Sequence, residues 1–406
     1  MMVCIKKRFF NLNRLLLHAF GLWSDEQTIF ARFRATMLYS LLISSIVFQL
    51  SRLFILEYSF DLIVRIVSCT TFFAMFTITP FSLEINMKTI KHLFNQKQYI
   101  YDQLKDRNEI AIYDKYGYSG KHFTTIIIIF LVCALCGNFV IVYWPYILDI
   151  VVPKNESHTS PMIQFLSEYF HVSEKYQFLV LVHFNTAITA GSIVFVGTTT
   201  MLFSYFLHIC GMFEIARRNV VYSYRIEQAM AIELLHNCHI KNRIMIYRKM
   251  ICAIDMQRQA MEILKYIVTV IDETAFILVI TSVVCMSCYL FRVFRIESPM
   301  ERLEEVLVYF LVVSSILTMM FLGSYVGQEI IDHSNHVYVI TYNVSWYLAP
   351  LHIQKLILFL LQRRNKSCTL GVGGLITASF ECFATVKLLH LFVGIVEASR
   401  LLYSTG

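Results

Sequence analysis

Two Cys-x-x-Cys pairs are the residues whose spacing most resembles a redox or zinc motif. They are Cys133/Cys136 and Cys285/Cys288, and both lie inside apolar runs. A thiol in such a run usually serves as a small packing residue. The sequence also contains no His-x-x-x-His pair, no HExxH, no GxSxG and no phosphate-binding glycine loop. We therefore expect neither an enzyme nor a bound cofactor.

A second cluster combines carboxylates and imidazoles at helical spacing. Four residues at i, i+3, i+4 and i+7 would share one helical face: Glu329, Asp332, His333 and His336. That face could bind a metal ion, or it could meet water or a partner helix at the end of a membrane span. The second arrangement is the commoner one, so no metal site is predicted.

The elements that must position these residues are membrane helices. Of the 406 residues 57% are hydrophobic and 16% are charged, whereas a soluble domain carries about 25% charged residues. The mean hydropathy is +0.59. A helix crosses the bilayer with roughly 20 apolar residues, and seven segments qualify: 36–56, 62–83, 122–148, 176–208, 263–291, 303–326 and 371–397. The sequence predicts an all-α membrane protein.

Basic residues indicate how these seven helices are oriented. The segments 1–35, 84–121, 209–262 and 327–370 hold 25 of the 35 Lys and Arg residues, and the opposite side holds 6. Basic loops stay in the cytoplasm, so we expect an intracellular amino terminus and an extracellular carboxyl terminus. Such sorting reflects topology and not nucleic-acid binding. The sequon at Asn155 then falls in the long outer loop, where it can be glycosylated.

The chain divides into four regions on this topology. Residues 1–35 form a cytoplasmic amino-terminal segment, and 36–326 hold the first six spans and a ligand pocket. Residues 327–370 form a cytoplasmic packing helix and loop, and 371–406 hold the last span and a short outer tail. The charged and apolar residues of 211–262 alternate at helical spacing, so we expect cytoplasmic extensions of the fourth and fifth spans that pack together.

Aromatic and small residues gather in the outer halves of the second to fourth spans. Large rings opposite small residues would enclose an apolar cavity with few polar groups, which is typical of small-molecule sites. The same stripes also serve helix packing or lipid contact, and periodicity does not decide between the two. The residues are Phe72, Phe73, Phe76, Gly137, Val140, Tyr143, Trp144, His183 and Ala187.

Three stretches of the sequence resemble the insect odorant receptor family. The amino-terminal run from Leu16 to Trp23 is similar to a Gly-Leu-Trp element that precedes the first span of that family. The run from Gly327 to Tyr347, with Tyr342 and Trp346, resembles the segment after the sixth span, where Tyr and Trp pack a cytoplasmic helix. Ser379 to Lys387 follows the family's last span in order and spacing.

The resemblance implies a ligand-gated, non-selective cation channel in the cell membrane of olfactory sensory neuron dendrites. Four subunits would surround a pore lined by the last span, including Phe392, Val396 and Ser399, with Val396 at an apolar gate. The short 209–262 segment is typical of a ligand-tuned subunit, which implies the shared co-receptor and lipid as partners. A volatile odorant would bind the predicted pocket, with Tyr309 as a further wall.

Within this pocket, Tyr143 and His183 are the candidates for binding a ligand oxygen. A gustatory receptor has the same architecture, but its Thr-Tyr and Gln-Phe signature is missing from the last span. A G-protein-coupled receptor requires the opposite orientation. A transporter or membrane enzyme requires a functional cluster of intramembrane polar groups, and the sequence shows only scattered ones.

Overall fold

The computed structural model of the chain consists almost entirely of helices. It describes residues 5–23, 28–51, 53, 59–151, 174–232, 240–296, 303–344, 346–348, 350–362, 369–374 and 376–386. The helices in chain order are α1 (Ile5–Phe9), α2 (Asn11–Ala19), α3 (Ile29–Leu50), α5 (Phe60–Ile85), α6 (Met87–Gln103), α7 (Arg107–Val151), α9 (Glu174–Ile232), α10 (Ile240–Phe294), α11 (Leu303–Asn343), the 3-10 helix η1 (Trp346–Leu348) and α12 (Leu351–Gln362).

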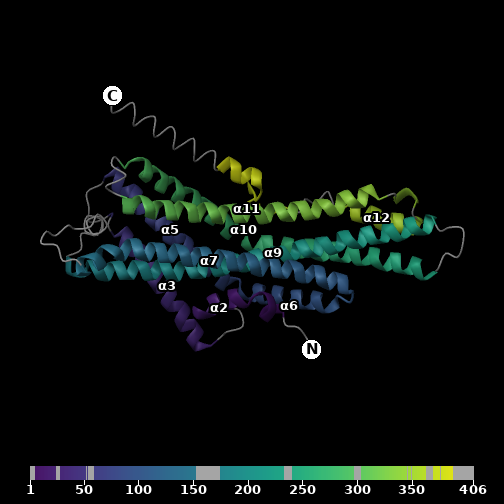
Figure 1. Cartoon of the computed structure of the whole chain (residues 1–406), viewed down its shortest axis with the longest axis horizontal. Coiled ribbons are helices and arrows are strands. Elements are labelled where there is room, and N and C mark those ends of the chain that lie inside the picture. Colours follow the sequence, from purple (N-terminus) through teal and green to yellow (C-terminus); the bar gives the residue numbers. More distant parts are fainter. Residues whose placement is uncertain are drawn as a thin grey trace, which may run out of the picture.

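Six described helices are long and apolar enough to cross a membrane: α3, α5, α7, α9, α10 and α11. The prediction of an all-α membrane protein is confirmed. Four of these helices, α7, α9, α10 and α11, run along the long axis of the molecule (Figure 1). The helices α9 and α10 continue well beyond the predicted spans and pack side by side, as the periodicity of 211–262 predicts.

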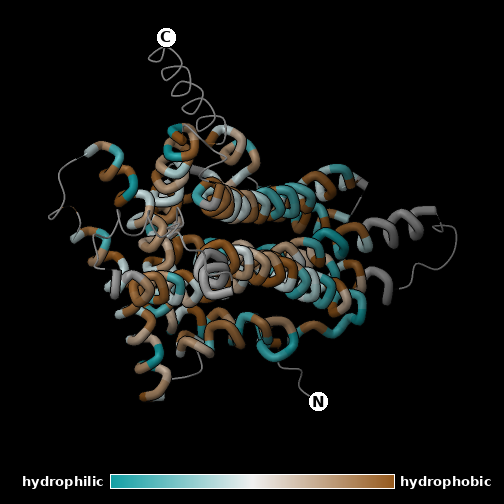
Figure 2. Tube along the Cα trace, turned by 60° about the vertical axis from the view of Figure 1, so that its left-hand side comes forward, coloured by the Kyte–Doolittle hydropathy of each residue, from teal (hydrophilic) through white to brown (hydrophobic). Residues whose placement is uncertain are grey.

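Hydrophobic residues cover much of the outer surface of the bundle. Figure 2 shows them along the long helices, whereas hydrophilic residues gather mainly toward the right-hand end of that view. Large apolar side chains such as Phe33, Ile129, Phe139 and Ile280 are exposed. An exposed apolar belt of this extent is what a lipid-facing surface requires.

The predicted seventh span begins later than expected. Its first residues form a two-stranded antiparallel hairpin of β1 (Gly371–Val372) and β2 (Ile376–Thr377), and a helix starts only at Phe380. Gly373 has a φ of +62°, which side chains with a Cβ rarely adopt. Its backbone N–H donates to Asp272 Oδ1 on α10 at 2.6 Å. These contacts attach the hairpin to α10. Residues 387–397 of the span lie outside the described residues.

The amino-terminal helices close the side of the bundle formed by α6 and α9. Phe10 is fully buried, and its ring stacks on His208 of α9 with centroids 6.0 Å apart. Phe10 also contacts α6, because Lys97 Nζ lies 4.0 Å from the Phe10 ring centroid and 5.1 Å from the Tyr205 ring centroid. Burial lowers the pKa of Lys97 well below its ordinary value. The segment 5–23 is therefore an integral part of the core.

A second core lies where α12 meets α9, α10 and the end of α11. Ile353, Ile357 and Leu360 recur at i, i+4 and i+7, so one face of α12 is buried. Tyr342 and Trp346 are predicted to pack the cytoplasmic helix, but the apolar side chains of α12 make that contact. Both aromatic side chains are exposed, and Tyr342 stacks only on Tyr338, with centroids 6.3 Å apart, among the ring contacts of the described residues.

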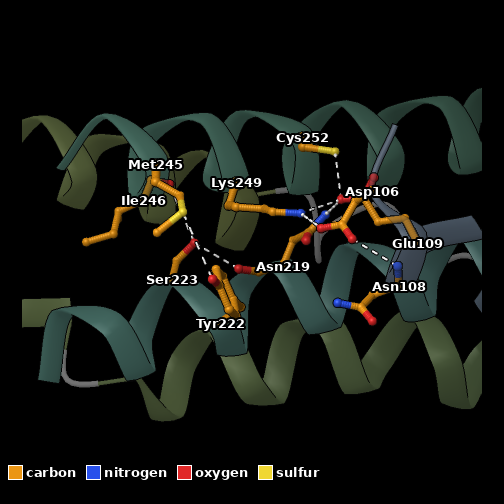
Figure 3. Close-up of polar contacts among 10 residues, drawn as sticks. All are labelled: Asp106, Asn108, Glu109, Asn219, Tyr222, Ser223, Met245, Ile246, Lys249 and Cys252. Atoms are coloured by element: carbon orange, nitrogen blue, oxygen red, sulfur yellow. Dashed lines mark hydrogen bonds and ion pairs between the residues drawn. The ribbon is translucent and has the colours of Figure 1, made fainter. Parts of the chain in front are cut away.

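A polar cluster joins the start of α7 to α9 and α10 near the second core (Figure 3). Lys249 Nζ donates to Asp106 Oδ2 at 2.6 Å and to Glu109 Oε1 at 2.8 Å. Asn219 Nδ2 donates to the same Glu109 oxygen at 3.1 Å. The Lys249 ammonium and the backbone N–H of Asn108 hold the pKa of Asp106 below its ordinary value. One lysine thus neutralises the carboxylates of a cluster that joins α7, α9 and α10.

Replacing Lys97 with Met is expected to stabilise the protein by about 1 to 3 kcal/mol, because removing a buried amine that has no hydrogen-bond partner outweighs the loss of its contacts with the Phe10 and Tyr205 rings. Lys97 Nζ has no hydrogen-bond partner among the described residues. The pKa of Lys97 is lower in the folded protein than in the unfolded chain, so the folded protein binds fewer protons at this site. The free energy of unfolding therefore rises as the pH increases toward the unfolded lysine pKa of about 10.4. The thermal midpoint of the purified protein should rise from about pH 7 to pH 10, and less steeply in the variant.

The control is Lys91→Met, which changes an exposed lysine on the same helix. It should keep the pH slope of the unchanged protein. A lower midpoint for Lys97→Met than for the unchanged chain at neutral pH would contradict the assignment of an unpaired, destabilising amine.

Replacing Lys249 with Met should destabilise the protein by about 2 to 4 kcal/mol, because the buried Glu109 carboxylate and the half-buried Asp106 carboxylate lose their cation. The side chain of Glu109 is only 9% exposed. The matched control is Arg258→Met, whose partner Asp255 is 47% exposed and should cost less than about 1 kcal/mol. Thermal midpoints measured in one detergent compare the two. Equal losses would show that the Lys249 cluster contributes no more than a surface ion pair.

Candidate functional site

An apolar cavity of about 260 Å³ lies among α5, α7, α9, α10 and α11. Arg292 near the end of α10 and Val308 near the start of α11 line it, so the cavity occupies the half of the bundle away from α12. One residue of α3, Gln49, also contributes. Most of the lining is aromatic or branched aliphatic, and the described lining includes Phe72, Phe73, Phe76, Phe130, Leu131, Leu135, Asn138, Val142, Phe184, Asn185, Phe195, Tyr289, Tyr309, Val312 and Ile316.

Edge-to-face contacts between aromatic rings connect the α5 and α9 walls of the cavity. The Phe72 and Phe76 centroids lie 4.7 Å apart with the rings edge to face. Phe73 meets Phe184 of α9 at 5.6 Å, and Phe76 meets Phe195 of α9 at 5.9 Å. Edge-to-face contacts of this kind are favourable for aromatic pairs. They hold α5 and α9 at a distance set by ring size.

Four of the predicted pocket residues line this cavity together: Phe72, Phe73, Phe76 and Tyr309. They come from α5 and α11, which are adjacent to the cavity along several turns. Their role in binding a ligand stays a prediction.

The α7 residues predicted for the pocket lie elsewhere. Gly137 is half-buried, Val140 is 55% exposed, and neither lines the cavity. The ring of Tyr143 packs on Phe139 with centroids 4.5 Å apart. Trp144 belongs to α7, but its side chain is outside the described residues. An all-apolar helix carries no periodic signal for the face that meets its neighbours, and the face that lines the cavity is Leu131, Leu135, Asn138 and Val142.

The α9 residues predicted for the pocket also lie on a different face of their helix from the one that lines the cavity. His183 Nε2 lies 3.2 Å from Ser44 Oγ and 3.3 Å from Ser45 Oγ on α3. Ala187 is fully buried in the core but does not line the cavity. The cavity side of α9 instead carries Phe184 and Asn185, one or two positions away.

Two amides are the polar pair that sequence reasoning missed. Asn138 Nδ2 of α7 donates to Asn185 Oδ1 of α9 at 2.9 Å, and both residues line the cavity. Asn185 Nδ2 donates to the Leu181 carbonyl at 3.2 Å. The available signal was an amide in an otherwise apolar span, because a polar group inside lipid ordinarily faces a partner or a cavity.

A charged triad closes the end of the cavity where α10 and α11 meet. Arg292 Nη2 donates to the Tyr309 hydroxyl, which donates to Glu305 Oε2 at 3.2 Å. The Arg292 guanidinium also lies 4.3 Å from the Tyr309 ring centroid, a cation–π distance. All three residues are buried. Arg292 follows directly after the predicted fifth span, 263–291, so only the structure places it beside Tyr309.

The possible metal and redox residues form no such site in the described part of the chain. No three His, Cys, Asp or Glu side chains among the described residues are placed to hold a metal ion. His333 Nε2 lies 3.3 Å from Glu329 Oε2 and 3.2 Å from the Tyr116 hydroxyl of α7, which is contact with a neighbouring helix. Cys133 and Cys136 are exposed free thiols.

Some predicted functional residues cannot be placed. The pore residues Phe392, Val396 and Ser399 and the sequon residue Asn155 lie outside the described residues.

Comparisons with known proteins agree with this fold. The family model described as "7tm Odorant receptor" matches residues 59–389. The chain is similar to the insect olfactory receptor OR5 from Machilis hrabei in complex with eugenol, with 13% identity, a TM-score of 0.72 and coverage of 97% of each chain. A second structure of that receptor gives 12% identity, a TM-score of 0.73 and coverage of 96% of each chain. No curated protein sequence matches.

The structural likeness shows a shared seven-transmembrane receptor fold, and the family model extends over most of the chain. This family consists of multi-pass membrane receptors and is not a class of enzymes. We conclude that the chain belongs to the 7tm odorant receptor family.

Proposed function

We propose that this chain is the ligand-tuned subunit of an odorant-gated, non-selective cation channel. Its ligand would be a volatile small molecule bound in the cavity among α5, α7, α9, α10 and α11. The observation that carries the proposal is the cavity itself, since an apolar chamber with a few convergent polar groups is typical of small-molecule sites. A receptor of the same fold has been solved with eugenol, which supports a small aromatic or similar ligand here.

Apolar contact would supply most of the affinity. Each 100 Å² of ligand surface removed from water contributes about 2.5 kcal/mol, and the Phe72, Phe73 and Phe184 rings provide flat surfaces for it. We assign recognition of a ligand oxygen to Asn138 and Asn185, because these amides line the cavity. This assignment replaces Tyr143 and His183, which do not line the cavity. Tyr143 packs on Phe139 and Phe178 and hydrogen-bonds with Asn185. His183 contacts Phe184 and serines of α3.

Ligand binding would open the pore through α11. The wall residues Val312 and Ile316 continue along α11 to Phe321. The Phe321 ring stacks on Phe380 of the last helix, with centroids 5.9 Å apart, and meets Phe383 at 5.6 Å. A ligand that shifts α11 therefore pushes on the start of the last helix. We propose that this helix carries Phe392, Val396 and Ser399 to the pore, where an apolar ring at Val396 gates by dewetting.

Activation requires that the ligand bind the open arrangement better than the closed one. A preference of about 5.5 kcal/mol moves a two-state equilibrium from 1:99 to 99:1. A molecule that fills the cavity equally well in both states would be an antagonist. We propose that the partner subunits are the odorant co-receptor and that the complex resides in the dendritic membrane of olfactory sensory neurons, with the amino terminus inside.

The first test is whole-cell current from cells that express this chain with or without an insect odorant co-receptor while volatiles are applied. We expect a fast cation current that requires the co-receptor and persists when G-protein signalling is blocked. Surface-expressed chain with co-receptor that gives no current to a broad panel including eugenol would contradict the proposal.

A second test replaces both cavity amides, in Asn138→Leu/Asn185→Leu. Exchanging both partners of this half-buried hydrogen bond for apolar groups leaves no amide unpaired and so costs little stability, whereas a ligand oxygen loses its partner. The half-maximal concentration of oxygenated ligands should rise about tenfold, which corresponds to about 1.4 kcal/mol, while that of hydrocarbons stays constant. The control is Thr186→Val, an exposed position on α9. An unchanged ranking of ligands would reject the amides as the oxygen site.

A further inference from the structure

A second apolar cavity of about 300 Å³ lies next to the last helix. Its described walls come from α5, α7, α9, α10, α11, the β1–β2 hairpin region and the helical residues 380–386. In Figure 1 this yellow terminal segment lies beside α11. We refer to this space as the inner cavity and to the one described above as the outer cavity. The inner cavity is therefore bounded on one side by the helix proposed to line the pore.

The two cavities share a wall but are lined mostly by different residues. Met75, Ile127, Phe195 and Met319 line both. Beyond them, the inner cavity is lined by Phe203, Phe206, Leu278, Val326, Leu370 and Phe383. Two of the four shared residues are methionines, whose unbranched side chains adapt to irregular shapes. The inner cavity thus has its own walls and is not an extension of the outer lining.

The chemistry of the inner walls selects an uncharged hydrocarbon. No described lining residue is charged. Ser324 also lines the cavity, and the hydroxyl groups of the other three, Thr199, Thr200 and Ser282, donate to carbonyls of their own helix, at 2.8, 2.6 and 2.6 Å. Their protons are therefore already used, and a ligand with unmet polar groups would lose hydrogen bonds to water on entry.

The glycine on α11 provides a route into the inner cavity. Gly323 lines it and is exposed on its other side, and a Cβ built there would meet no atom within 4 Å. A molecule dissolved in the bilayer can approach the cavity along this open stretch of α11. A larger side chain at 323 would occupy the space without a clash in the protein.

We propose that the inner cavity is a second binding site, separate from the odorant site, for a small neutral hydrocarbon. An occupant would contact α11 at Met319 and the last helix at Cys382 and Phe383. It would thereby modulate the position of the last helix relative to α11.

Free cysteines of the chain allow one labelling experiment to report on both cavities. Cys382 lines the inner cavity and Cys69 lines the outer cavity. Cys133 and Cys136 are exposed on α7 and line neither. The full chain in lipid nanodiscs is treated with hexyl methanethiosulfonate, with or without limonene, and modification of each cysteine is followed by peptide mass spectrometry.

At a limonene concentration about ten times its dissociation constant, competition should slow labelling of Cys382 about tenfold. Labelling of Cys133 and Cys136 should not change. In Gly323→Leu the protection of Cys382 should be lost, because the leucine fills the approach. Gly137→Leu is the matched control, since a Cβ there also meets no atom within 4 Å and the position lines neither cavity.

Equal labelling of Cys382 with and without limonene would overturn the proposal. So would equal slowing of all four cysteines, which indicates dilution of the reagent in the bilayer, or protection that survives Gly323→Leu. Cys69 reports separately on the outer cavity. If no member of the volatile panel, eugenol included, protects Cys69 at saturation while limonene protects Cys382, the odorant site is refuted and the inner site stands.

Discussion

The absence of water inside the bilayer is the constraint on which the rest of this structure depends. Backbone N–H and C=O groups that cannot bond to water must bond within the segment, so the spanning parts are helices. The six described candidate spans satisfy this requirement over 22 to 51 residues. Any ligand chamber in such a protein has to be built between helices. The outer cavity is of this kind, and the inner cavity adds only the β1–β2 hairpin region to its helical walls.

Lipid contact also removes the ordinary driving force that brings helices together, because a lipid tail is as apolar as a leucine side chain. Polar and aromatic contacts then join the helices at defined faces. The Asn138–Asn185 amide pair and the interlocked Phe73 and Phe184 rings join α7 and α5 to α9 around the outer cavity. His183 joins α9 to α3 through two serines. The chamber is thus a product of a few polar and aromatic contacts.

Outside the apolar region the helices are held by different interactions. Lys249 ties the start of α7 to α10 through two carboxylates, and the apolar face of α12 covers the ends of α9 and α10. Before the last helix, Asp272 accepts a hydrogen bond from the backbone of the β1–β2 hairpin. Gly327 of α11 lies so close to this region that a Cβ there would be 2.0 Å from the Ala378 carbonyl oxygen. The last helix therefore starts from a tightly attached point, and its Phe380 and Phe383 rings contact Phe321 of α11.

Composition and apolar run length alone determined the fold class of this protein, because a solvent of lipid demands long apolar helices. The aromatic run at Phe72, Phe73 and Phe76 likewise marked one wall of the outer cavity, since those rings are too bulky to pack without neighbours on several helices. The sequence did not determine which face of α7 or α9 meets the cavity: Val140 is exposed and Asn138 lines it. A helix that is apolar on nearly every face carries no periodic signal for its rotation, and an isolated amide such as that of Asn138 was the available mark. That rotation, the pairing of Arg292 with Tyr309, and the hairpin before the last helix depend on contacts between distant segments, so only the tertiary structure decided them.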